Sequence, residues 1–220
     1  MTLLSCIEVV TGKQPNASVI WLHGLGANGH DFEAIVPELQ LADNLSIRFI
    51  FPNAPSIPVT VNGGVTMPAW YDILDMSIAR KVDTQQLTQS AEAVIALVER
   101  EISRGISSER IILAGFSQGG AVVYQAGLSS HHKLGGLLAM STYLATEETL
   151  VRHDNNAQLP ICIMHGKQDP VVPEILGKSA YAYCNEHGYK SQYKTYNMPH
   201  SVCAAQISDI SNWLNARLQS

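Results

Sequence analysis

Gly115-Phe116-Ser117-Gln118-Gly119-Gly120 follows the apolar run 110–114 and precedes a segment rich in Ala, Val, Tyr and Leu. A buried strand, a G-x-S-x-G turn and a helix in this order are typical of a nucleophile elbow, which points a serine hydroxyl off the sheet. The flanking glycines leave room for the strained turn. A glycine-rich turn whose serine only caps the helix gives the same pattern, so an acid and a histidine are needed to decide between the two.

Both residue types follow in later loops. Asp169 comes shortly after the strand-like run 160–164, and His200 follows the alternating run 192–197. With Ser117 they give the chain order Ser, Asp, His that α/β-hydrolases use. The carboxyl ends of parallel strands meet at one edge of a sheet, where such proteins build their sites. We therefore predict that Ser117, Asp169 and His200 form a catalytic triad.

An early glycine-rich loop offers the second half of such a site. The apolar run 17–22 ends in His23-Gly24-Leu25-Gly26, and a helix is expected over 31–39. In a serine hydrolase, backbone amides after the nucleophile and in a loop of this kind hold the oxyanion. These two amides would be those of Gln118 and Leu25. The loop lacks the Gly-Lys-Ser/Thr ending of a phosphate loop, and we interpret His23 as a structural histidine.

The chain resembles the small carboxylesterase, lysophospholipase and acyl-protein thioesterase family of α/β-hydrolases. The segments that carry this resemblance span nearly the whole sequence: Leu22-His23-Gly24-Leu25-Gly26 with Gly29-His30, Pro52-Asn53-Ala54-Pro55, Met67-Pro68-Ala69-Trp70-Tyr71-Asp72, Gly115 to Gly120, His165-Gly166 with Asp169-Pro170, and Pro199-His200. The sequence departs from the family pattern at Thr142, where a smaller residue is usual, and at Lys167-Gln168. We expect these departures to alter only the rim of the site.

Residues 53–80 show no clear periodicity and contain several prolines and glycines. Long loops in compact domains are often functional, so we interpret the large apolar residues of this one as an acyl-chain wall or partial lid; covering the sheet edge is an equal alternative. The resemblance adds two groove residues after predicted strand ends. The predicted substrate-binding residues are Trp70, Ile73, Leu74, Met76, Tyr143 and Val171.

Strand-like and helix-like segments alternate along the chain. Strands are expected near 5–10, 17–22, 47–51, 110–114, 134–140, 160–164 and 192–197, and long amphipathic helices near 84–103 and 204–218. This alternation indicates βα units, a mostly parallel sheet and helices on both faces. The prediction is a single α/β-hydrolase domain over residues 1–220 with no large cap domain.

Composition limits the partners of the chain. Its 220 residues are 46% apolar and carry a net charge of −5 without a basic block, which disfavours nucleic acid. No apolar stretch approaches the roughly 20 residues of a transmembrane helix. The four cysteines show no metal-ligand spacing, and together with the lack of a signal peptide they indicate free thiols and a cytoplasmic protein. The oligomeric state stays open, with a homodimer as one option.

The predicted reaction is hydrolysis of carboxylic esters, thioesters or lysophospholipids through an acyl-enzyme, with no metal and no organic cofactor. The substrate would be a small-molecule or lipid acyl ester, or an acylated protein. Two alternatives remain at this level. The same triad could transfer acyl groups to an alcohol or cleave peptides, and the fold could serve as a non-catalytic module that binds acyl ligands.

Overall fold

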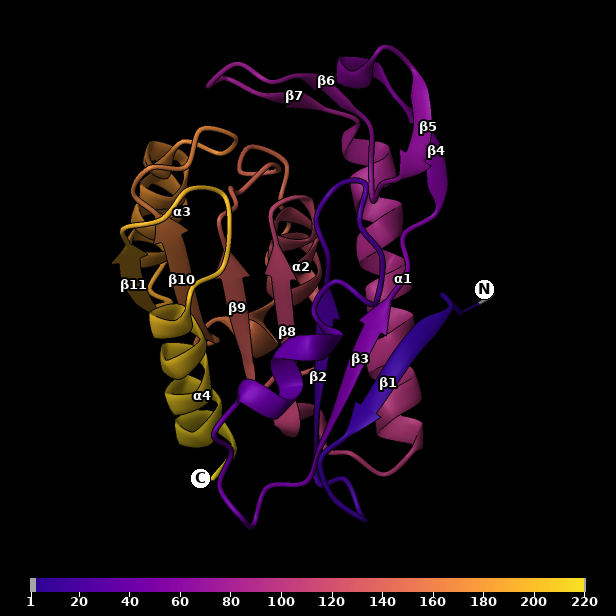
Figure 1. Cartoon of the computed structure of the whole chain (residues 1–220), viewed down its shortest axis with the longest axis vertical. Helices are drawn as coiled ribbons and strands as arrows, with labels where there is room; N and C mark the ends of the chain where they lie inside the picture. The colour runs from indigo at the N-terminus through magenta and orange to yellow at the C-terminus, as the bar shows by residue number, and fades with distance from the viewer. Residues whose placement is uncertain (1–2, 220) are drawn as a thin grey trace.

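A seven-stranded sheet forms the centre of the computed structural model, which describes residues 3–219 (Figure 1). Neighbouring strands are parallel, except for the antiparallel pair at the N-terminal edge. In spatial order the strands are β1 (Cys6–Val10), β3 (Ile47–Pro52), β2 (Ala17–Leu22), β8 (Ile111–Phe116), β9 (Gly136–Met140), β10 (Pro160–Gly166) and β11 (Lys190–Tyr196). The predicted mostly parallel sheet is therefore confirmed.

Helices cover both faces of this sheet, also as predicted. On one face lie α1 (Thr84–Ser103), α2 (Gln118–Ser129) and α3 (Glu174–Glu186), and on the other lie α4 (Ala204–Leu218) and the short 3₁₀ helix η1 (Glu33–Glu38). Strand side chains alternate between the two cores: Ile20 and Leu22 pack on the first face, whereas Val19 and Trp21 pack on the second. Within residues 3–219, no helix has both the length and the apolar character required to span a bilayer.

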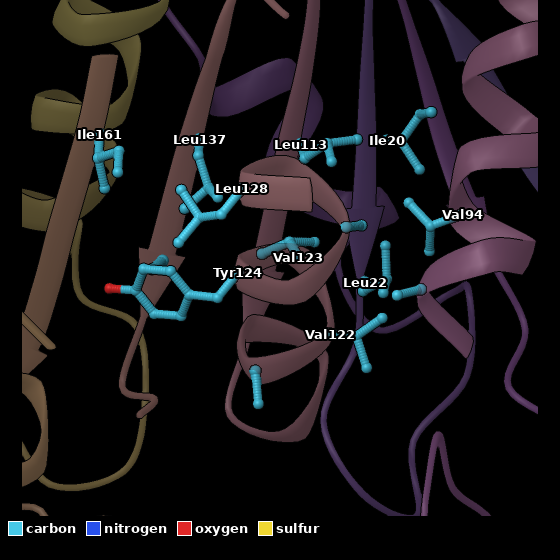
Figure 2. Close-up of a cluster of buried hydrophobic side chains, with 14 of the residues drawn as sticks. Ile20, Leu22, Val94, Leu113, Val122, Val123, Tyr124, Leu128, Leu137 and Ile161 are labelled. Carbon is cyan, nitrogen blue, oxygen red and sulfur yellow. The ribbon is translucent and has the colours of Figure 1, made fainter. Parts of the chain in front are cut away.

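The first core is centred on α2 (Figure 2). Val123 and Leu128 of this helix lie beside the strand residues Leu113 and Leu137, and Val94 approaches from α1. All five side chains are completely buried. This packing fixes α2 on the central strands, and with it the turn between β8 and α2 that carries Ser117.

Residues 53–80 are more regular than the sequence indicated. Together with the two residues that follow, they form two small hairpins, β4 (Ser56–Val59) with β5 (Val65–Pro68) and β6 (Ile73–Asp75) with β7 (Lys81–Val82), and the first is closed through η2 (Thr60–Asn62). These strands have two to four residues, too few for a period-2 pattern to be recognised. The prediction of an irregular loop was therefore wrong.

Three further elements differ from the prediction in their type or in their ends. The helix expected over 31–39 is only η1, which contains Pro37 and lacks regular α-helical structure. Strands β8 and β10 continue two residues beyond their predicted ends, because Phe116 pairs with Met140 and Gly166 pairs with Tyr196. The other short 3₁₀ segments are η3 (Ser108–Arg110) and η4 (Asp154–Asn156).

Replacing Leu113 by Ala should lower the free energy of unfolding by about 2–5 kcal/mol, because its side chain is completely buried between the central strand and α2. The matched control is Val65→Ala, whose side chain is 59% exposed on the first hairpin; a change within about 0.5 kcal/mol is expected there. Urea unfolding followed by circular dichroism measures both. Equal losses would contradict a core centred on α2.

Candidate active site

Three loops at the carboxyl edge of the sheet bring together the predicted triad residues. Ser117 follows β8, Asp169 follows β10 and His200 follows β11. His200 Nε2 lies 3.0 Å from Ser117 Oγ, and His200 Nδ1 lies 2.7 Å from Asp169 Oδ2. One imidazole thus joins the hydroxyl to the carboxylate. The Ser–His and His–Asp contacts have the geometry required for nucleophilic catalysis.

Ser117 occupies a strained turn that several contacts hold in place. Its φ of 53° and ψ of −120° fall in a region that non-glycine residues rarely adopt. The Ser117 amide donates to the Met140 carbonyl at 2.9 Å, and the Ser117 carbonyl accepts from Thr142 Oγ1 at 2.6 Å. A Cβ atom at Gly119 would lie 2.6 Å from the His23 carbonyl oxygen, so only glycine permits this approach of α2 to the end of β2.

Thr142 therefore has a different place from the one expected. The sequence indicated a residue at the rim, but Thr142 is buried beneath the turn and hydrogen-bonds the backbone of Ser117. It also packs against Gly120, where an added Cβ would meet the threonine side chain at 2.5 Å. The side chains of Lys167 and Gln168 are exposed, as expected for a rim.

The carboxylate of Asp169 is held by hydrogen bonds on both oxygens. Oδ1 accepts from the amides of Val171 at 2.9 Å and Val172 at 2.8 Å, while Oδ2 accepts from His200. Burial acts to raise the pKa of this carboxyl, but the bonds from His200 and the two amides outweigh it, so the pKa lies below its ordinary value. Asp169 is therefore ionised at neutral pH and can orient the His200 ring.

A second histidine supports this acid loop, although no role for it could be recognised from the sequence. His165 is completely buried at the end of β10 and donates from Nε2 to the Val172 carbonyl at 2.8 Å. Burial lowers the pKa of this imidazole, which keeps the ring neutral. The only sequence signal was the pair His165-Gly166, which the family resemblance included without a function. His165 holds the backbone of Val172, whose amide in turn binds Asp169.

The two amides predicted for the oxyanion lie in segments that pack on each other. Gln118 is the first residue of α2, and amides at this end of a helix have no partner within the helix. Leu25 lies in the turn after β2, which is fixed by the bond from the Gly26 amide to the Pro68 carbonyl at 2.8 Å. His23 is a structural residue in this turn: its buried ring contacts the Gly24 carbonyl and accepts from the Ala54 amide.

Two of the predicted groove residues are buried beneath the site and do not form an open wall. Trp70 is only 1% exposed, and its indole Nε1 donates to the His23 carbonyl at 2.9 Å. The Gln118 side chain binds both the Trp70 amide and the Tyr71 carbonyl, at 2.8 and 2.6 Å. Ile73 is buried in the same core. Their size and position in a proline-rich segment suggested a surface wall, but they anchor that segment to the sheet.

Three of the remaining groove residues are exposed around the second hairpin and the acid loop, and the fourth is buried beside them. Leu74, Met76 and Val171 are exposed, whereas Tyr143 is buried and its hydroxyl contacts that of Tyr71 at 2.9 Å. A hollow of about 570 Å³ is lined by Tyr143, Leu176 and Arg80, among others.

Arg80 joins the second hairpin to the acid loop. The residue lies in the connection between β6 and β7, where its guanidinium contacts the Val171 carbonyl and lies 4.9 Å from the centre of the Tyr143 ring. The hairpin therefore extends to the same loop that holds Asp169. This role of Arg80 could not be predicted from the sequence, because a single arginine between short strands has no recognisable pattern.

A serine at a strained strand-to-helix turn, with an acid and a histidine from later loops of a mostly parallel sheet, defines an α/β-hydrolase. Residues 4–218 match the family model described as Phospholipase/Carboxylesterase. The chain belongs to this family and is a hydrolase of the carboxylic ester type.

The relatives cover the chain almost completely. Acyl-protein thioesterase 1 of Gibberella zeae is 37% identical over 217 residues, which cover 94% of this chain and 92% of the relative. The protein of the same name from Saccharomyces cerevisiae is 36% identical over 97% of this chain and 99% of its own length. The crystal structure of Zea mays acyl-protein thioesterase 2 superposes with a TM-score of 0.86 at 27% identity, covering 97% of this chain and 99% of that one.

Replacing Gln118 by Ala should lower the free energy of unfolding by about 1–3 kcal/mol, because the buried Trp70 amide and Tyr71 carbonyl both lose their side-chain partner. The Gln118 backbone amide remains in this variant. Gln89→Ala, at an exposed position of α1, is the control. Urea unfolding measures the effect, and equal stability of Gln118→Ala and Gln89→Ala would contradict the anchoring role.

Proposed function

We propose that this chain hydrolyses acyl esters and thioesters in two steps, with Ser117 as nucleophile, His200 as general base and acid, and Asp169 as the group that orients His200. The observation that carries this proposal is the 3.0 Å contact between His200 Nε2 and Ser117 Oγ. Because Nδ1 faces the ionised Asp169 carboxylate at 2.7 Å, it carries the proton of the neutral ring. Nε2 is then free to accept the serine proton.

In the first step, Ser117 Oγ attacks the acyl carbonyl carbon while its proton moves to His200 Nε2. The tetrahedral intermediate collapses when the bond to the alcohol or thiol breaks, and the His200 proton goes to that leaving group. A water molecule then attacks the acyl-serine carbonyl carbon and gives its proton to His200. The bond to Ser117 Oγ breaks, the His200 proton passes to Oγ, and the carboxylic acid and free Ser117 are released. Asp169 stabilises the imidazolium that forms in both steps.

The backbone amides of Leu25 and Gln118 are assigned to the oxyanion of each intermediate. Support comes from the location of Gln118 at the first position of α2 and from the packing of Gly119 against His23. Removal of one such donor typically reduces the rate about 10²–10³-fold. Besides substrate and water, this scheme uses only groups of the chain, and the proposed mechanism includes no metal and no organic cofactor.

The proposed substrates carry an extended acyl chain, as S-acylated proteins, lysophospholipids and simpler esters do. Relatives named acyl-protein thioesterase support this class, and so do the exposed apolar side chains of Leu74, Met76 and Val171 beside the acid loop. All four cysteines are unpaired, which fits action in the reducing cytoplasm.

Ser117→Ala and His200→Ala should each reduce hydrolysis of p-nitrophenyl acetate by several orders of magnitude, because the triad acts as a unit, and the double variant should be little worse than either. Circular dichroism and thermal unfolding serve as the control for folding. A fluorophosphonate probe should label the wild type and fail to label Ser117→Ala. Substantial activity or labelling in Ser117→Ala would refute the assignment and leave the non-catalytic binding module as the better description.

Leu74→Ala should lower kcat/KM for octanoate esters and spare acetate esters, because only a long acyl chain reaches the second hairpin. Each methylene buried by the hairpin contributes at most about 0.8 kcal/mol, which sets the scale of the loss. Val65→Ala, an exposed apolar residue on the first hairpin, is the matched control. Trp70 and Ile73 are unsuitable for this test, because they are buried. Equal losses on acetate and octanoate would contradict an acyl-binding role for this hairpin.

A further inference from the structure

Three potential metal ligands meet at the end of α2 that is remote from Ser117. Glu99 projects from α1, and His131 and His132 follow the last turn of α2. One ligand atom from each residue lies within 4.8 Å of the other two. With about 1.5 Å of rise per residue, the 12-residue helix α2 places this cluster roughly 18 Å from the elbow. It is therefore separate from the proposed catalytic site, and its function is independent of the proposed hydrolysis.

The side chains of Glu99 and His132 approach each other without forming a hydrogen bond. His132 Nε2 lies 3.8 Å from Glu99 Oε1, which is too long for a hydrogen bond. The same nitrogen is shielded from solvent and has no hydrogen-bond partner among residues 3–219. Shielded polar atoms normally have a partner. A cation between the nitrogen and the carboxylate would supply one.

The backbone that carries both histidines is fixed by a neighbouring turn. The Asn156 side chain is buried and donates to the Ser130 and His132 carbonyls, both at 2.8 Å. The Asn155 side chain donates to the His131 carbonyl, and the His132 amide donates to Ser130 Oγ at 3.1 Å. The backbone positions of both histidines are therefore fixed, and the centres of their imidazole rings lie 3.9 Å apart. Such a preorganised pair loses little entropy when it binds a metal.

The chemistry of these ligands selects the metal. Two imidazoles and one carboxylate are ligands of zinc, whereas magnesium and calcium prefer oxygen atoms alone. Around a tetrahedral zinc at about 2.0–2.2 Å from each ligand, the ligand atoms are roughly 3.4 Å apart. The exposed side chains of Glu99 and His131 can make the small movement required. A hollow of about 370 Å³ beside Glu99 and His131 leaves space for water as the fourth ligand.

We propose that Glu99, His131 and His132 form a zinc site that links α1 to the segment after α2. When bound, the metal connects α1 to the segment after α2 more tightly than the 3.8 Å contact between Glu99 and His132 does. Its effect is on stability, since binding to the folded state alone stabilises that state in proportion to the logarithm of zinc concentration.

The test uses the full chain after treatment with a chelator, in the His200→Ala background so that the triad histidine does not bind metal. Equilibrium dialysis should find one zinc per chain, and thermal unfolding should show a Tm that rises with zinc and is unaffected by magnesium. Loss of a residue that hydrogen-bonds to a metal ligand typically weakens metal binding roughly 10–100-fold. Glu99→Gln and His132→Gln remove a ligand itself, so each should weaken zinc binding by at least this factor.

The matched control is His30→Gln, because His30 also lies beside a carboxylate, with Nδ1 2.7 Å from Glu33 Oε2, but no third potential ligand joins this pair among residues 3–219. This variant should bind zinc as the background does. Affinity is measured at a temperature where circular dichroism shows every variant to be folded. Absence of zinc binding in the background would reduce the cluster to an ion pair, and zinc affinity in Glu99→Gln and His132→Gln equal to that of the background would place the metal elsewhere; either result overturns the proposal.

Discussion

The close approach of α2 to the end of β2 is the constraint on which the rest of the site depends. Gly119 permits it, because a side chain there would overlap the His23 carbonyl. The approach sets the start of α2, and with it the unusual backbone angles of Ser117 and the position of the Gln118 amide. It also brings the turn that contains Gly24 and Leu25 next to Ser117. Core packing of α2 therefore supplies the energy that keeps a strained serine in place.

Much of this arrangement could be predicted from the sequence because it depends on local signals. The elbow has a short pattern with a steric cause, and strands such as β2 and helices such as α1 have enough residues to show their period. The order of the elements then determined which loops share the carboxyl edge. Asp169 and His200 were identified by their place after a strand, and the structure brings them within hydrogen-bond distance of their partners.

What the sequence could not show depends on contacts between distant segments. The strand β7 has only two residues, too few to show the alternation of apolar and polar side chains that is typical of a strand. Trp70 looked like a surface residue because its neighbours in the sequence do not indicate the Gln118 side chain that anchors it. Thr142 was misplaced for the same reason, since its partner is the Ser117 carbonyl, 25 residues away. His165 supports Asp169 through the backbone carbonyl of Val172. Every residue has such a carbonyl, so this contact cannot be recognised from the type of the partner residue.

The position of β11 at the edge of the sheet has a consequence for how the protein acquires its active site during folding. His200 lies beyond this strand and is separated from Ser117 by 83 residues in the chain. Contacts over such distances form late, because closing a long segment of chain costs entropy before the contact is made. A chain in which β1 to β10 are already paired still lacks an oriented imidazole. Placing the His200 imidazole beside Ser117 therefore requires the docking of β11, whereas α1 and α2 pack on strands that precede β11 in the chain.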